Sequence, residues 1–220
     1  MKRLLTGAGS GIGRDLARRL RDRGDELWLV VRDAARVADE FPDAHVLEAD
    51  LTDGTAIAGL RLPDRLDSVV HVAGMVELGP VADLDEAAWT GQLAVNLVAP
   101  ALLTRAALPA LRAAGGTVVL VNSGAGLRAS PGWSAYAASK FGLRALADAL
   151  RAEERENGVR VTSVFPGRTA TPMQEKVHRH EGKEYVDADW IRPDTVVDVI
   201  VSVLDLPADA TVPEVSISPR

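Results

Sequence analysis

The chain has 220 residues, of which 47% are hydrophobic and 25% are charged, and its net charge at pH 7 is −6. One α/β domain with a sizeable core fits this length, and the negative charge argues against binding to nucleic acid or to an anionic membrane. The absence of cysteine excludes disulfides, thiolate metal sites and a cysteine nucleophile. No apolar run reaches membrane-spanning length, and residues 1–6 pass into a glycine turn too soon for a signal peptide, so we expect a cytoplasmic protein.

Short β-branched runs alternate with longer helical patterns along the chain, which indicates βαβ units around a parallel sheet. Strands are predicted at 4–6, 27–31, 45–49, 68–72, 117–121, 159–165 and 211–217. Helices are predicted at 12–23, 86–112, 134–157 and 194–204, the second of them bent near Pro100, whereas residues 169–192 look polar and irregular. No repeat or linker interrupts this order. The sequence therefore predicts a single domain over residues 1–220, a Rossmann-type doubly wound parallel sheet of about seven strands with helices on both faces.

A glycine-rich turn follows the first predicted strand and leads into the first helix. Gly7, Gly11 and Gly13 give the spacing G-x-x-x-G-x-G, which differs from the common G-x-G-x-x-G fingerprint because position 12 is Ile12. Glycines let the backbone approach a pyrophosphate closely, and the N-terminus of a helix favours its negative charge. The place of the turn between a strand and an amphipathic helix favours a dinucleotide site over an ordinary tight turn.

The end of the second predicted strand is where the adenosine ribose of a dinucleotide would lie. Arg32 at this point favours a 2′-phosphate, because a guanidinium matches phosphate with two parallel hydrogen bonds. Asp33 is the competing signal, since a carboxylate favours a free 2′-hydroxyl, but it falls one residue later and can begin the next helix. Ser10, in the glycine turn, adds no positive charge. NADP(H) is therefore expected, and NAD(H) stays an alternative.

Asp50 follows the third predicted strand in the sequence Asp-Leu-Thr-Asp. Its carboxylate has the chemistry to accept a hydrogen bond from the amino group of an adenine. The same pattern at a strand end is equally that of a helix cap. Both interpretations stay open, and they do not exclude one another.

Tyr136 and Lys140 stand four residues apart in a predicted helix, so their side chains share a face. A phenol loses its proton only near pH 10, and a fixed ammonium beside it favours the phenolate and lowers its pKa. Ser123, just beyond the strand 117–121, can place a hydroxyl beside the phenol and hold a substrate oxygen. The set points to acid–base catalysis, although the Tyr/Lys spacing alone also fits an ordinary solvated helix face.

The order of these motifs from residue 4 to residue 171 resembles the short-chain dehydrogenase/reductase family. The family's Thr-Gly-x-x-x-Gly-x-Gly begins at Thr6, and its structural Asn-Asn-Ala-Gly is half kept as His71-Val72-Ala73-Gly74. Val72 cannot make the hydrogen bonds by which the family asparagine joins the central strand to its neighbours, which raises a question about local stability. The catalytic tetrad of the family falls on Asn96, Ser123, Tyr136 and Lys140, and its Pro-Gly-plus-threonine motif on Pro166, Gly167 and Thr171.

The resemblance implies hydride transfer between a nicotinamide and a carbonyl or alcohol carbon, with no metal. In it, Tyr136 would exchange a proton with the reacting oxygen, Ser123 would hydrogen-bond that oxygen, and Lys140 would lower the pKa of Tyr136 and hold the nicotinamide ribose. Asn96 would position a water that links Lys140 to solvent, or else be a satisfied polar group in a packed helix. The implied cofactor-binding residues are Gly7, Ser10, Gly11, Ile12, Gly13, Arg32, Asp50, Leu51, Ala73, Gly74, Tyr136, Lys140, Pro166, Gly167, Thr169 and Thr171.

In the family, substrate specificity lies after the Pro-Gly motif, so residues 171–192 are expected to form a short, mobile substrate lid. The lid leaves an open pocket for a small-molecule carbonyl or alcohol substrate, with Trp133 as one apolar wall. The alanine-rich helices at 93–112 and 134–156 carry more apolar surface than one sheet face needs. Equivalent helices join subunits in the family, so we expect a homodimer or homotetramer.

Two other functions remain open at this point. A nucleotide-sensing regulator of the same fold would bind the cofactor without turnover and would not need the tetrad. An epimerase or dehydratase of the extended branch shares Tyr-x-x-x-Lys, but the glycine spacing and the lack of a large C-terminal substrate domain disfavour it. A metal site is not expected from His178 and His180, because residues two apart do not share a helix face.

Overall fold

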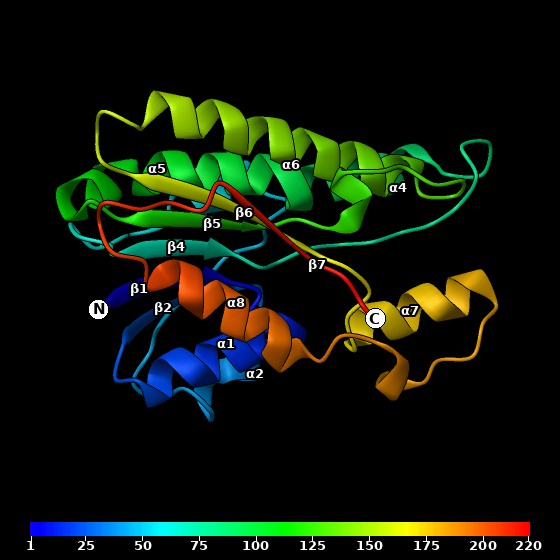
Figure 1. Ribbon diagram of the computed structural model, residues 1–220, viewed down its shortest axis with the longest axis horizontal. Coiled ribbons are helices and arrows are strands. Elements are labelled where there is room, and N and C mark those ends of the chain that lie inside the picture. The colour runs from blue at the N-terminus through cyan, green and yellow to red at the C-terminus, as the bar shows by residue number, and fades with distance from the viewer.

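Seven parallel strands form one twisted sheet in the computed structural model, which describes residues 1–220 (Figure 1). The strand order β3-β2-β1-β4-β5-β6-β7 reverses direction between β1 and β4, as in a doubly wound sheet, so the predicted fold class is confirmed. β5 has no exposed residue, as expected for a central strand covered on both faces. The strands are β1 (Lys2–Thr6), β2 (Glu26–Val31), β3 (His45–Glu48), β4 (Ser68–His71), β5 (Thr117–Val121), β6 (Arg160–Pro166) and β7 (Glu214–Ile217).

Helices cover both faces of the sheet (Figure 1). One face carries α1 (Gly11–Asp22) and α8 (Pro193–Leu204), which pack together over a core cluster that includes Leu16, Leu20 and Val197. The other face carries α4 (Glu86–Leu93), α5 (Ala99–Ala114) and α6 (Ser134–Glu153), with Leu103, Leu111 and Leu143 in a second cluster. The remaining elements are α2 (Ala35–Ala38), α3 (Gly54–Ala58), α7 (Pro172–Glu181) and two short 3₁₀ turns, Gly124–Gly126 and Asp187–Asp189.

The long helical stretch Glu86–Ala114 departs from the sequence-based expectation in two ways. Its irregularity is a π turn, Ala94–Val98, between α4 and α5, and Pro100 lies in the first turn of α5, where a missing N–H costs little. The stretch has a mean hydropathy of 1.5 over its most apolar window, so by length and composition alone it is able to cross a membrane. The expectation that no run reaches that length was wrong, and the burial of α5 against the sheet accounts for part of the apolarity.

The sequence led us to expect that residues 169–192 are irregular. That expectation was wrong, because they contain α7. Thr171 caps this helix by accepting a hydrogen bond from the backbone N–H of Gln174, Pro172 occupies its first turn, and Gly182 ends it with φ of 63°. Its buried residues, Gln174, Val177 and His178, recur at i, i+3 and i+4. The helix lies beyond the carboxyl ends of the central strands (Figure 1), where it covers the cleft described below.

Candidate active site

A cleft of about 1280 Å³ runs along the carboxyl ends of the strands, from the glycine turn to α7. Its size exceeds the 300–1,000 Å³ typical of single small-molecule sites, so it has room for a dinucleotide with a second small molecule. All of the cofactor-binding residues expected from the sequence line it, together with Ser123. Asn96 is the one residue of the expected set that does not line the cleft; it lies behind the wall at Gly74.

The glycine turn leaves no space for side chains on its inner side. A Cβ at Gly7 would lie 2.7 Å from the backbone nitrogen of Ala73, and one at Gly13 would lie 2.3 Å from the carbonyl oxygen of Gly7. Gly7 also has φ of 80°, which favours glycine. Ser10 precedes α1 but makes no capping hydrogen bond, so the first N–H groups of that helix face the cleft without a side-chain acceptor.

Thr6 joins the ends of β1 and β4 through its side chain. Its hydroxyl oxygen accepts from the backbone N–H groups of Val72 and Ala73, each at 3.1 Å, and so joins the ends of β1 and β4. The Val72 side chain instead packs against the core cluster on the α1 side of the sheet. Val72 thus contributes apolar packing at this position, and the Thr6 bonds to the backbone do not depend on its side chain.

The residues at the end of β2 divide into capping and unpaired groups. Asp33 accepts a hydrogen bond from the backbone N–H of Ala35 at 3.0 Å, so its carboxylate helps to begin α2. Arg32 lines the cleft and forms no ion pair within 4 Å, although its charge acts on the carboxylate of Asp50. Across the cleft, Asp50 accepts hydrogen bonds from the backbone and hydroxyl of Thr52, which hold the pKa of its carboxyl below the usual value. Asp53, not Asp50, caps α3.

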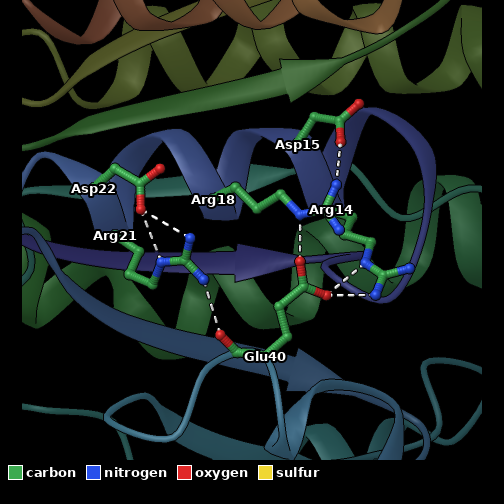
Figure 2. A network of polar contacts seen from close by, with 6 residues as sticks. All are labelled: Arg14, Asp15, Arg18, Arg21, Asp22 and Glu40. Atoms are coloured by element: carbon green, nitrogen blue, oxygen red, sulfur yellow. Dashed lines mark hydrogen bonds and ion pairs between the residues drawn. The ribbon is translucent and has the colours of Figure 1, made fainter.

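Arg36 is a cleft residue that the sequence analysis missed. It lies in α2, and its guanidinium is within 3.9 Å of the position that a Cβ on Gly9 would take, so it covers the glycine turn beside Ser10. Figure 2 shows that the arginines of α1 are held elsewhere: Arg14 and Arg18 both pair with the carboxylate of Glu40. Arg36, like Arg32, pairs with no carboxylate. No local pattern in the sequence marks Arg36, because it becomes relevant only through its contact with Gly9.

Tyr136 and Lys140 project from α6 into the cleft, and both are buried. The ammonium of Lys140 donates a hydrogen bond to the carbonyl oxygen of Val121 at 3.0 Å and lies 5.8 Å from the centre of the Tyr136 ring. Burial lowers the pKa of Lys140 to about 8. Burial also raises the pKa of Tyr136, while a hydrogen bond with Ser123 lowers it. The lowered pKa that the sequence led us to expect is therefore absent here, because desolvation of the phenol is the largest effect.

Two asparagines connect the loops that carry the cleft residues. The amide of Asn96 bonds the backbone N–H and C=O of Met75, each at 2.8 Å, and donates to the hydroxyl of Ser139 at 2.9 Å. Asn122 accepts from the backbone N–H of Ser123 at 2.9 Å and donates to the carbonyl of Lys140 at 3.1 Å. Asn122 was not among the residues expected from the sequence. It joins the Ser123 loop directly to α6.

α7 closes one side of the cleft. Val177 packs with Val76 and Tyr136 in a small buried cluster, against which Trp133 also lies. The guanidinium of Arg168 donates to both carboxylate oxygens of Glu181, at 2.5 and 2.9 Å. The segment that the sequence led us to expect as a mobile lid thus contains a packed element, since a buried face and an ion pair connect α7 to the rest of the site.

The chain matches the family model described as short chain dehydrogenase over residues 3–182. It is 31% identical to the uncharacterized oxidoreductase YbbO of Escherichia coli over 90% of this chain and 78% of that one. An uncharacterized oxidoreductase of Staphylococcus epidermidis is 29% identical over 98% of this chain and 96% of its own. A solved structure described as a short chain dehydrogenase/reductase family protein, 30% identical, superposes with a TM-score of 0.87 over 99% of this chain and 95% of its own. The chain therefore belongs to the short-chain dehydrogenase/reductase family of NAD(P)-dependent oxidoreductases.

Proposed function

We propose that this protein is an NADP(H)-preferring oxidoreductase that transfers a hydride between the nicotinamide and a carbonyl or alcohol carbon, with Tyr136 as acid–base. The observation that carries the proposal is that Tyr136, Lys140 and Ser123 line one cleft together with the glycine turn. A turnover screen of carbonyl compounds with NADPH and with NADH, followed at the nicotinamide absorbance, tests it directly.

The glycine turn fits the pyrophosphate of such a cofactor. The close approach of Gly7 to Ala73 leaves backbone rather than side chains at the cleft surface, and the uncapped N-terminus of α1 offers N–H donors. Gly11 and Thr171 face each other across this region, with a Cβ on Gly11 only 3.3 Å from the threonine methyl carbon. The Pro166–Thr171 segment would therefore enclose the cofactor from the side opposite the turn. When bound, the nicotinamide supplies or accepts the hydride.

The proton would move at the phenol oxygen of Tyr136. In reduction Tyr136 would donate the proton to the substrate oxygen, and in oxidation Tyr136 would remove the proton from the substrate hydroxyl. Ser123 lines the cleft beside the phenol and would donate to the reacting oxygen. The ammonium of Lys140, 5.8 Å from the centre of the Tyr136 ring, would stabilise the phenolate that reduction leaves behind. Both N–H donors of the Asn96 amide are used by Met75 and Ser139, so its side chain would contact a water only through the amide oxygen.

The NADP(H) preference rests on Arg32 and Arg36. Both guanidinium groups lie at the adenosine end of the cleft, and the carboxylate of Asp33 is engaged by α2. The 2′-phosphate would add negative charge beside two guanidinium groups that form no ion pair within 4 Å, and Arg36 would supply the charge that Ser10 lacks. Asp50 retains capacity to accept a bond from adenine beside its contacts with Thr52.

The single domain over residues 1–220, with a substrate lid at 171–192, completes the proposal. A homodimer or homotetramer is supported by two large apolar side chains on the helices that cover one face of the sheet, Val98 and Phe141, which are 47% and 43% exposed. The cytoplasmic location expected from the sequence is also retained, and fractionation of cells that express the protein tests it.

A further inference from the structure

We propose that the substrate carries an oxyanion, a carboxylate or a phosphate, and that Lys176 on the lid binds it. This inference rests on the proposed function, because it concerns the second ligand of the same cleft. It goes further by assigning a chemical class to that ligand and a recognition residue to the lid.

The charges on the substrate side of the cleft are predominantly positive. Beyond Tyr136 and Lys140, the charged lining residues are Arg128, Arg168, Lys176 and Glu181. Glu181 is already bound by Arg168 and by Lys183, so it neutralises no other cation. Arg128 and Lys176 are left without a carboxylate partner, in a chain whose net charge is −6. An excess of cations in a concave, partly apolar site attracts anions.

Lys176 is anchored to a residue that packs on the proposed proton donor. Its ammonium donates a hydrogen bond to the carbonyl oxygen of Val76 at 3.1 Å. The side chain of Val76 packs on Tyr136 together with Val177, the residue that follows Lys176. The ammonium is therefore fixed to the backbone of a residue whose side chain packs on Tyr136. An ammonium has three donors and the backbone carbonyl takes one, so two remain for an anionic ligand.

The side chains around this cation are apolar, so the rest of the substrate is expected to be an apolar carbon chain. Trp133 and Val177 lie against Tyr136, and Met173 lines the cleft nearby. An oxyanion at Lys176 would fix one end of the substrate, while its carbon chain would lie along these side chains with the carbonyl at Tyr136. Arg128 is exposed, so it would attract anions toward the cleft without fixing their position.

The test compares pairs of substrates that differ only in charge. A panel of 2-, 3- and 4-oxo acids is assayed with NADPH beside the methyl ester of each acid, and a phosphorylated hydroxyketone beside its unphosphorylated form. We expect the wild type to favour the anionic member of at least one pair. The Lys176→Gln variant should lower kcat/KM for that anion by about 10- to 100-fold, mainly through KM, and leave the neutral member unchanged. A loss on an oxo acid would identify the oxyanion as a carboxylate, and a loss on the phosphorylated hydroxyketone would identify it as a phosphate.

Arg179→Gln is the matched control, because Arg179 lies on the same helix, pairs with Glu175 and is 65% exposed. The Arg179→Gln variant should have the wild-type kcat/KM for both members of each substrate pair. Equal turnover of anionic and neutral members, or an equal loss on both in Lys176→Gln, would overturn the inference while leaving the proposed function intact. If the wild type turned over no carbonyl compound in the panel, the proposed function would fail together with it.

Discussion

The ammonium of Lys140 lies 5.8 Å from the centre of the Tyr136 ring, and both side chains are buried in the same wall of the cleft. Burial acts on the two groups in opposite senses, since it raises the pKa of Tyr136 and lowers that of Lys140. Both shifts disfavour charge, so the pair depends on its neighbours to work as an acid–base. Ser123 and the carbonyl of Val121 are the two neighbours that the structure provides.

We expect the reduction activity to fall as the pH rises through about 8. Below the pKa of about 8, Lys140 is charged and stabilises the phenolate that Tyr136 becomes when it donates its proton. Above it, the lysine loses its charge and that stabilisation disappears. The measurement is kcat/KM for the carbonyl substrate between pH 6 and 10, with substrate-free stability checked over the same range. A profile that stays flat to pH 10 would contradict the role given to Lys140.

Replacing Arg32 or Arg36 with alanine should weaken binding of ligands that carry a 2′-phosphate by about 10-fold or more each. Adenosine 2′,5′-bisphosphate and adenosine 5′-monophosphate are suitable probes, because they differ in that phosphate and need no turnover. Calorimetric titration of each variant should show a loss of affinity for the bisphosphate and an unchanged affinity for the monophosphate. Arg18→Ala is the control, since Arg18 pairs with Glu40 outside the cleft (Figure 2). An equal loss for both probes, or a wild type that binds both equally, would refute the NADP(H) preference.

His71 should make the protein sensitive to acid. Burial lowers its pKa to about 3, against 6.5 for a free histidine, so the folded chain binds this proton less well than the unfolded chain. The stabilisation is complete above pH 6.5 and is lost as the pH falls toward 3. Between pH 7.5 and 5.5, the free energy of unfolding should drop by about 1.4 kcal/mol more in the wild type than in His71→Asn. Urea unfolding of both proteins at the two pH values measures this difference. An equal drop in the free energy of unfolding in the wild type and in His71→Asn would rule the effect out.

The exposed apolar side chains on the helical face should hold copies of the chain together. Light scattering at micromolar concentration should give the mass of a dimer or tetramer for the wild type. The double change Val98→Asp and Phe141→Asp should lower that mass, because it places charges in an apolar contact. Val81→Asp is the control, since Val81 is 68% exposed but lies outside these helices. A wild type that elutes as a monomer would remove the support for an oligomer.

The fold could be predicted from the sequence because its signals are local. The β-branched runs, the glycine turn and the helix period at α1 each depend on a few neighbouring residues. α7 was missed although Thr171-Pro172 and Gly182 bracket it, since its polar composition concealed a buried face of three residues. α2 and α3 are too short for a periodic pattern to show them.

The candidate site was predictable in its residues but not in its tertiary contacts. The sequence placed Tyr136, Lys140 and Ser123 together, yet the direction of the Tyr136 pKa depends on burial, which no local pattern reports. Arg36 and Lys176 were missed for the same reason. Each becomes relevant through a partner distant in sequence, Gly9 for the arginine and Val76 for the lysine.

The most direct test of the proposed function is the Tyr136→Phe variant, with turnover and cofactor binding measured on the same sample. The variant removes only the phenolic hydroxyl, so the wall of the cleft and its contact with Val177 should persist. Turnover is expected to fall by about 10²- to 10⁴-fold, while the Kd for NADPH stays within a factor of about 2 of the wild type. Turnover that survives the change would show that Tyr136 is not the acid–base and would contradict the proposed mechanism.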